Sequence, residues 1–404
     1  ELKFESSTFE GFDDFIEREQ SSTMIFVKLL TKLLRDKKFG ERVVPIVPDE
    51  ARTFGMDALF RQFGIYSSEG QKYEPEDADK VMFYRESESG IMLEEGINEA
   101  GAFSAWLALA TSYSNNQFPM IPFYIFYSMF GFQRIHDLAW AAGDSRARGF
   151  LLGATSGRTT LNGEGLQHQD GHSHVLASTI PNCRSYDPAF SYEISTIIQE
   201  GIKDMYVQGN DRFYYLTLMN ENYQHPKRPK NATSKNIING AYKFLEAKNP
   251  SIRILASGVT LNFAIQAEKL LSKMNVIAEI WSITSFNELY KGAIESDRNN
   301  RLEINNSPSH VEECFSNEMT TIAVSEYIRS YPNQIRQWVK GDYIVLGTDG
   351  FGRSDTRDKL RDHFEINANH IALNALYSLN MKKEAREFIK SNKIKLDEIA
   401  PWLK

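Results

Sequence analysis

Short apolar runs alternate with amphipathic stretches over most of the chain. Apolar runs bounded by polar turns are typical of buried parallel strands, whereas apolar positions three and four residues apart indicate a helix face. We expect strands at residues 43–47, 121–127, 149–154, 212–218, 252–256, 276–283, 320–324 and 343–346. We expect helices from Ser22 or Thr23 to Leu34 and at residues 95–110, 134–142, 188–205, 261–271 and 325–338. The alternation predicts an α/β protein with two mostly parallel sheets, each flanked by helices.

The pattern divides the chain into two domains. A length of 404 residues favours two or three domains, each large enough to bury a core. Residues 224–236 are basic, polar and proline-bearing, which is typical of a linker, and the strand–helix alternation restarts after them. We therefore place the domains at residues 1–228 and 229–404. Because the chain begins Glu1-Leu-Lys-Phe4, without methionine, we expect it to be the later part of a longer polypeptide.

Composition narrows the class of protein. Hydrophobic residues make up 42% of the chain and charged residues 25%, as in an ordinary globular protein. A net charge of −7 argues against a partner that is nucleic acid or an anionic membrane, and no apolar stretch is long enough to span a bilayer. The two cysteines, Cys183 and Cys314, are far apart and follow no metal spacing. We expect free thiols and a cytoplasmic protein.

One loop, residues 157–174, concentrates ionisable side chains directly after a predicted buried strand. It carries two carboxylates and three histidines: Glu164, Asp170, His168, His172 and His174. Glycines free its backbone to bend, and histidines titrate near neutral pH, so a site is predicted at the end of the strand. Zinc is an alternative, because clustered histidines and a carboxylate can bind it. The glycines argue against a helix that would present such ligands, so we expect no metal there.

Further carboxylates lie at other predicted strand and helix ends. Glu99 falls in the first turns of the helix at residues 95–110, which is apolar nearly all round and therefore buried. Its alternative role is a solvated carboxylate favoured by the helix dipole. Glu50 follows the strand at 43–47, where it could equally form a salt bridge with Arg52. Between them, Glu69 to Arg85 is polar and long, and we predict a lid.

Three stretches together resemble the thiamine-diphosphate enzymes of the transketolase superfamily. They are Gly96-Ile-Asn-Glu99 with its small-residue helix, Pro122 to Phe130 followed by Arg134 and Asp137, and Glu164-Gly-Leu-Gln-His168. Longer motifs, at residues 48–56, 156–168 and 346–355, are similar to those of the homodimeric bacterial pyruvate dehydrogenases. The resemblance runs from about Ser22 to the end of the chain. It implies two transketolase-like domains, the first binding the pyrimidine of the cofactor and the second C-terminal-like.

The resemblance also implies roles for individual residues. Glu99 would bond a pyrimidine ring nitrogen and promote the imino tautomer, for which a buried carboxyl of raised pKa is suited. Phe130 would pack against the pyrimidine, although ordinary core packing is nearly as good an account of it. Tyr127 would lie beside the cofactor with its hydroxyl near the substrate. His168 would bond the substrate and move protons.

Glu164 and Glu50 would orient His168 or the substrate. The implied reaction is thiamine-diphosphate-dependent oxidative decarboxylation of pyruvate with reductive acetylation of a lipoyl group on a dihydrolipoyl acetyltransferase core. A homodimer is implied, with residues 95–110 a candidate interface. In this family the diphosphate and Mg²⁺ are held by an earlier domain with a Gly-Asp-Gly motif, which this sequence lacks.

Two alternatives stay open from the sequence. The first is another superfamily enzyme acting on a different 2-oxo acid or on a sugar phosphate. Few basic residues lie near the loop at 157–174, which disfavours a phosphorylated substrate. The second is a non-catalytic half that lacks the diphosphate-binding domain.

Overall fold

The computed structural model describes residues 6–48, 51–74 and 84–403. The chain forms two compact units, and neither is one continuous stretch. The first contains the described residues up to Ser156, with Leu176–Arg184 and Ile198–Pro226. The second contains Gly157–Val175, Ser185–Ile197 and the described residues from Lys227 onward. The loop that the sequence singled out at 157–174 therefore folds as part of the second unit.

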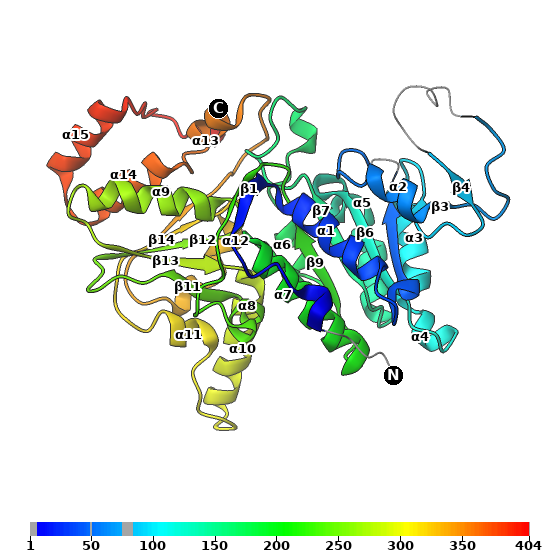
Figure 1. Ribbon diagram of the computed structural model, residues 1–404. Helices are drawn as coiled ribbons and strands as arrows, with labels where there is room; N and C mark the ends of the chain where they lie inside the picture. Colours follow the sequence, from blue (N-terminus) through cyan, green and yellow to red (C-terminus); the bar gives the residue numbers. More distant parts are fainter. Residues whose placement is uncertain (1–5, 49–50, 75–83, 404) are drawn as a thin grey trace. The chain divides into compact units, whose positions relative to one another are not determined.

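A six-stranded sheet forms the centre of the first unit (Figure 1). Its spatial order is β5 (Leu93–Glu94), β2 (Val43–Val47), β6 (Ile121–Tyr127), β7 (Phe150–Ala154), β9 (Phe213–Thr217) and β8 (Cys183–Tyr186). From β5 to β9 each neighbouring pair is parallel. All five residues of β2, β7 and β9 are buried, which is why these strands are apolar without alternation. The predicted parallel sheet is confirmed.

Helices cover both faces of this sheet, because side chains alternate across each strand. α1 (Ser22–Leu34) begins at Ser21, whose hydroxyl caps Met24 N, and it packs Phe26 against Phe123 of β6. α3 (Glu99–Ala110) and α5 (Phe132–Asp144) pack on the face that carries Tyr124, with Trp106 fully buried among them. The start of α3 is thereby fixed against β6.

The second unit is built on a five-stranded sheet (Figure 1). Its order is β11 (Ala241–Leu245), β13 (Ala278–Ile283), β12 (Ile252–Ala256), β14 (Thr321–Val324) and β15 (Tyr343–Leu346), parallel except for the antiparallel edge strand β11. α9 (Thr260–Ser272) and α14 (Ala368–Ser378) pack on one face, and α15 (Lys382–Asn392) packs on α14. On the other face, α10 (Phe286–Arg301) and α11 (His310–Cys314) pack their apolar side chains against those of the sheet, forming a hydrophobic cluster.

The remaining elements are mostly short. The helices are α2 (Asp57–Phe63), α4 (Ser112–Asn115), α6 (Ser173–Ala177), α7 (Ser191–Ile202), α8 (Ser234–Asn239), α12 (Ser330–Asn333) and α13 (Arg357–His363). The tight turns are η1 (Ser6–Phe9), η2 (Gly40–Arg42), η3 (Ser128–Phe130), η4 (Leu166–His168), η6 (Arg336–Trp338) and η7 (Pro401–Leu403), and Lys203–Val207 is a π-turn continuing α7. The short strands are β1 (Ile16–Gln20), β3 (Ile65–Tyr66), β4 (Glu86–Ser87) and β10 (Tyr223–His225).

Three sequence predictions of local structure are wrong. The helix expected at 325–338 is absent, because the side chain of Ser325 bonds Tyr327 N and Glu326 is buried against a distant residue, leaving α12 and η6. The predicted linker at 224–236 contains the end of β10 and the start of α8. The sequence pattern also predicted no strand before residue 43, whereas β1 is a strand that pairs antiparallel with β10. Polar edge strands give no apolar run, so the pattern missed them.

The predicted lid lies between β3 and β4, which pair in parallel. Residues 75–83 of it are outside the described residues, and its described part contains no helix or strand.

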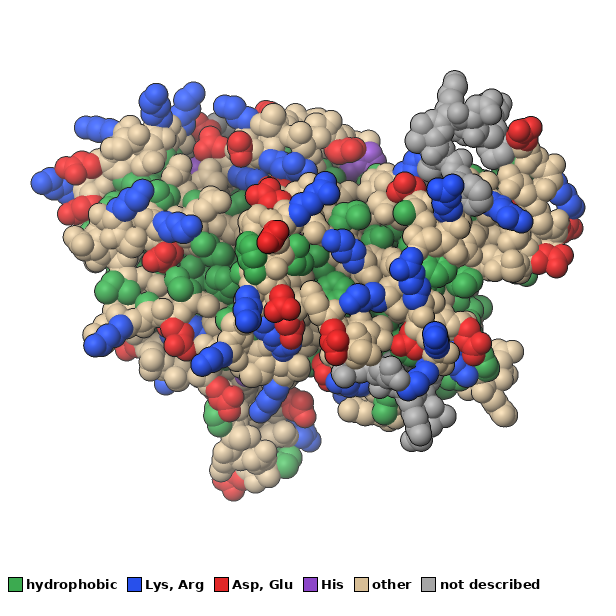
Figure 2. Space-filling model, viewed as in Figure 1, with side chains coloured by type: hydrophobic (Ala, Val, Ile, Leu, Met, Phe, Trp, Pro, Cys, Tyr) green, Lys and Arg blue, Asp and Glu red, His purple; other side chains and the backbone are tan. Residues whose placement is uncertain are grey.

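Acidic and basic side chains are interspersed over the face drawn in Figure 2. Among the residues that the structure describes, no helix has the length and apolar character needed to cross a bilayer.

Candidate functional site

Glu99 is the first residue of α3, and the local sequence places it there. Gly96 adopts a positive φ of 69°, and the side chain of Asn98 accepts a hydrogen bond from Gly101 N at 3.1 Å, which starts the helix one residue before Glu99. Glu99 is 9% exposed. Its Oε1 lies 2.5 Å from Arg134 Nη1. The carboxylate is therefore buried beside one cation rather than solvated.

Arg134 joins Glu99 to a group of aromatic rings. It lies in the first turn of α5, and its guanidinium is 4.3 Å from the centroid of the Phe130 ring. The ring of Tyr127 is 6.1 Å from that of Phe130, at an interplanar angle of 62°, and it also contacts Phe54 at 5.5 Å. The first unit thus brings Glu99, Phe130 and Tyr127 together.

The second unit carries His168 and Glu164. His168 ends the short turn η4, with its Nδ1 3.5 Å from Glu164 Oε2. The side chain of His168 is 26% exposed and that of Glu164 is 46% exposed. An accessible imidazole beside a carboxylate is suited to proton transfer and to binding an anionic or carbonyl oxygen.

The other ionisable residues of this loop have structural roles. Asp170 is fully buried and accepts hydrogen bonds from His172 N and Ser173 N, both at 2.9 Å. His174 is fully buried, stacked on Tyr331 at 4.8 Å and edge-on to Tyr327. Burial lowers the pKa of His174 to about 3, against the opposing effect of the Asp170 charge.

The histidines of the loop do not converge on a common point. His174 is enclosed by rings, whereas His168 faces Glu164. Within residues 6–48, 51–74 and 84–403, no group of three or more His, Cys, Asp or Glu side chains is arranged to hold a metal ion.

The predicted site residues thus fall into two groups in different units, and Glu50 lies outside the described residues. Arg134 belongs to one of the sequence motifs, but the sequence alone predicted no role for it. The sequence did contain one indication of its role: it is a basic residue at the start of the helix that follows the aromatic strand. The helix dipole disfavours a cation at that position unless a carboxylate pairs with it.

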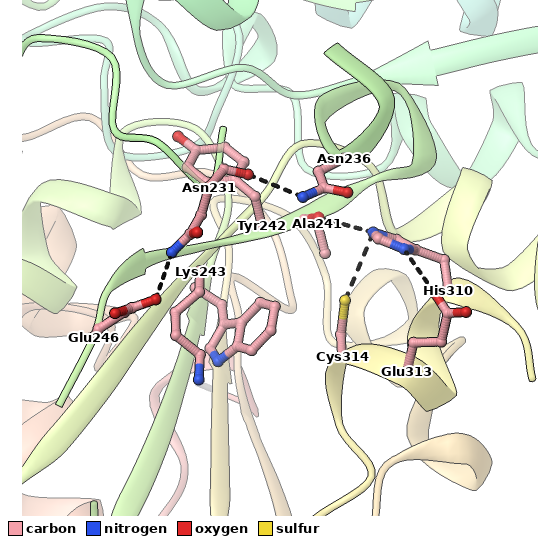
Figure 3. Close-up of a pocket in the computed structure, with 10 residues that line it drawn as sticks. Asn231, Asn236, Ala241, Tyr242, Lys243, Glu246, His310, Glu313 and Cys314 are labelled. Atoms are coloured by element: carbon pink, nitrogen blue, oxygen red, sulfur yellow. Dashed lines mark hydrogen bonds and ion pairs between the residues drawn. The ribbon is translucent and has the colours of Figure 1, made fainter. Parts of the chain in front are cut away.

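A cavity of about 270 Å³ in the second unit lies apart from the predicted residues (Figure 3). Its wall contains Cys314 Sγ 3.6 Å from His310 Nε2, and Glu313 Oε2 3.8 Å from His310 Nδ1. A carbonyl can only accept, so Nε2 must donate to Ala241 O at 2.9 Å and has no lone pair for the thiol proton. Burial raises the pKa of Cys314 to about 12. A raised pKa disfavours the thiolate form that acts as a nucleophile. Both cysteines are free thiols, as predicted.

The two mostly parallel sheets, each flanked by helices, form a transketolase-like α/β fold. The chain matches the crystal structure of transketolase from Campylobacter jejuni with a TM-score of 0.69 and 16% identity, over 93% of this chain and 49% of that one. At that identity the likeness shows the fold alone.

Sequence comparison narrows this class. Residues 5–226 match the model of the pyruvate dehydrogenase E1 component middle domain, and residues 240–367 match the transketolase-like TK C-terminal domain. The chain belongs to the pyruvate dehydrogenase E1 component family.

Two relatives illustrate the match. The pyruvate dehydrogenase E1 component of Pseudomonas aeruginosa is 57% identical over 371 residues, which is 90% of this chain and 42% of the relative. That of Escherichia coli K12 is 46% identical over 416 residues, which is 99% of this chain and 47% of the relative. The chain therefore spans about half the length of the curated relatives it matches.

Proposed function

We propose that this chain supplies the pyrimidine-binding part of the active site of a pyruvate dehydrogenase E1 component. The proposed reaction is thiamine-diphosphate-dependent oxidative decarboxylation of pyruvate with reductive acetylation of a lipoyl group. The observation that carries the proposal is the buried Glu99 at the start of α3, paired with Arg134 beside the Phe130 and Tyr127 rings.

These residues fit the pyrimidine half of thiamine diphosphate. A buried carboxyl can exchange a hydrogen bond and a proton with a ring nitrogen, and Phe130 offers a ring against which a flat heterocycle packs. Arg134 neutralises the charge of Glu99 and holds its carboxylate in one place. When bound, the cofactor would supply a carbanion at its thiazolium carbon.

His168 is the proposed residue for the substrate side. Its partly exposed imidazole would donate a hydrogen bond to the carboxylate or carbonyl of pyruvate and move a proton during turnover. Glu164, 3.5 Å from its Nδ1, would favour the tautomer with a proton on that nitrogen. Glu50 is proposed to orient the substrate.

The assembly is also proposed. The exposed positions of α3 are small and uncharged, at Ala100, Ser104 and Ala108, as expected of a helix that packs against a second copy in a homodimer. The lipoyl group would belong to a dihydrolipoyl acetyltransferase in the cytoplasm, in keeping with relatives named as E1 components. Mg²⁺ and the diphosphate would be held outside the residues of this chain. A pyrimidine-binding domain at 1–228 and a C-terminal-like domain at 229–404 are supported by family matches that end at 226 and begin at 240.

The test is Glu99→Gln in the full-length gene product, loaded with thiamine diphosphate and Mg²⁺. The amide keeps the shape of the side chain but cannot transfer the proton, so we expect pyruvate-dependent dye reduction to fall by about 10²-fold or more. Glu41→Gln, at an exposed glutamate of the same unit, should retain wild-type activity.

Two results would contradict the proposal. Near-normal reduction by the Glu99→Gln variant would remove Glu99 from the reaction. A wild-type protein that is neither stabilised by the cofactor with Mg²⁺ nor active with pyruvate would favour a non-catalytic half.

A further inference from the structure

The loop at 157–174 is bonded to a second segment of its own unit, residues 348–357, which follows β15. Arg158 Nη1 donates to the carbonyls of Thr348 and Gly350. Gly163 N donates to Asp355 O at 3.1 Å, and Arg357 Nε donates to Thr160 O at 2.6 Å. Segment 348–357 overlaps the motif at 346–355, which the proposed reaction leaves without a role. Its hydrogen bonds show that it supports the loop.

Gln169, the neighbour of His168, makes two hydrogen bonds with segment 348–357. Gln169 is 1% exposed, and both ends of its amide bond the backbone of Arg353. Nε2 donates to Arg353 O at 2.7 Å, and Oε1 accepts from Arg353 N at 2.8 Å. The pair reproduces the two-way bonding of a strand pair, so it fixes position and orientation together.

The close approach of segment 348–357 to Gln169 requires glycine at position 352. A Cβ there would lie 2.6 Å from Gln169 Oε1 and 2.8 Å from Leu166 O, closer than real Cβ contacts. The glycine allows segment 348–357 to approach η4, the turn that ends at His168.

The backbone on the C-terminal side of His168 is held in the same way. Asp170 bonds the amides of His172 and Ser173, and Ile328 N donates to Gly171 O at 2.8 Å. On the N-terminal side, a Cβ on Gly163 would meet open space, and Glu164 is half-exposed. A single contact of 3.5 Å between two partly exposed side chains holds a histidine weakly. Among the described hydrogen bonds from segment 348–357, those of Gln169 are therefore next to His168, whereas the bond to Gly163 lies five residues before it.

We propose that Gln169 is the positioning residue for His168, a role that sequence reasoning gave to Glu164 and Glu50. This inference rests on the proposed function, since it concerns the residue that would transfer protons to and from pyruvate. Proton transfer depends steeply on the distance between the two heavy atoms, and a displacement of about 1 Å can cost about 10²-fold in rate. Gln169 itself contacts neither substrate nor cofactor in this account. It acts by holding the backbone from which His168 projects.

A double-mutant cycle tests this role in the full-length gene product with thiamine diphosphate and Mg²⁺. We expect Gln169→Ala to lower kcat for pyruvate-dependent dye reduction by about 10- to 100-fold, with a smaller change in KM. In the His168→Ala background the same substitution should change kcat by less than about 2-fold, because the residue it positions is gone. Gln169→Glu should behave like Gln169→Ala, because a carboxylate cannot donate to Arg353 O.

Asn182→Ala is the matched control, since the Asn182 amide donates to two backbone carbonyls in the first unit, those of Gly143 and Asp211. It should lower the melting temperature without a loss of kcat. Amide hydrogen exchange gives a readout without turnover. The peptide covering residues 163–168 should exchange at least about 10-fold faster in Gln169→Ala than in wild type, and at the wild-type rate in Glu164→Gln.

The outcomes separate this inference from the proposed function. An equal loss of kcat from Gln169→Ala in both backgrounds, or unchanged exchange at 163–168, would overturn the role of Gln169 while leaving the reaction in place. A wild-type protein without pyruvate-dependent activity would overturn the proposed function, and with it this role.

Discussion

The burial of His174 makes stability depend on pH in a way that one substitution can isolate. The ring is fully buried between Tyr331 and Tyr327, and burial lowers its pKa to about 3 despite the charge of Asp170. An unfolded chain takes up a proton at a histidine near pH 6.5. Between these values the unfolded state binds more protons, so the free energy of unfolding falls as the pH falls.

The magnitude follows from proton linkage. At pH 5.5 an ordinary histidine in the unfolded chain gains about 1.4 kcal/mol from protonation, and at pH 7.5 it gains less than about 0.1 kcal/mol. The folded state gains almost nothing over this range, because its pKa of about 3 lies well below it. His174 should therefore lower the free energy of unfolding by about 1.4 kcal/mol between pH 7.5 and 5.5.

His174→Phe keeps a flat ring in place and removes the titrating group. Equilibrium urea unfolding at pH 7.5, 6.5 and 5.5 should show a loss of stability on acidification that is about 1.4 kcal/mol smaller than in wild type. His225, whose pKa burial lowers to about 4, contributes equally to both proteins and cancels. Tyr331→Phe is the control: it alters the same packing but keeps His174, so its pH dependence should match wild type. The same pH dependence in His174→Phe and wild type would refute the reasoning.

Two further predictions concern buried groups of the second unit. Glu193 is fully buried and accepts hydrogen bonds from Tyr242 Oη, Ser282 Oγ and two backbone amides. In urea unfolding, Glu193→Ala should therefore lower the free energy of unfolding by about 3–5 kcal/mol, and Tyr242→Phe by about 1 kcal/mol. Equal losses for the two variants would contradict this. Burial raises the pKa of Cys314 to about 12. At pH 8 its thiol should therefore react with a disulfide reagent about 10³-fold more slowly in the folded protein than in urea. Rapid labelling of the folded chain would contradict this and show that the thiol is accessible.

The strands were predictable because parallel strands buried on both faces are mostly apolar. The run at 121–127 coincides with β6, and that at 252–256 coincides with β12 although it contains Arg253. The helix at 95–110 starts at Glu99 instead, since Asn98 caps it and the positive φ of Gly96 is incompatible with a helix before it. The expected helix at 325–338 failed for a tertiary reason: Glu326 accepts hydrogen bonds from Thr159, far away in the sequence. Local periodicity contains no information about such a partner.

The same limit applies to the candidate site. The burial of Glu99 could be predicted from an apolar helix, but its pairing with Arg134 depends on how the start of α5 packs beside α3. The closeness of His168 and Glu164 follows from their spacing of four residues in a glycine-rich turn. The support from Gln169 to Arg353 joins residues 184 positions apart. A pair of this kind cannot be found from spacing.

The interleaving of the two units has a consequence for evolution. The chain passes from one unit to the other after Ser156, Val175, Arg184, Ile197 and Pro226, so the second unit includes residues encoded well upstream of its main part. Glu193 lies in one of these upstream stretches, and its partners Tyr242 and Ser282 lie downstream. A C-terminal cassette shuffled in from another gene would arrive without the glutamate that satisfies its own buried hydroxyls. The buried hydroxyls of Tyr242 and Ser282 therefore depend on a residue encoded upstream of the main part of their unit.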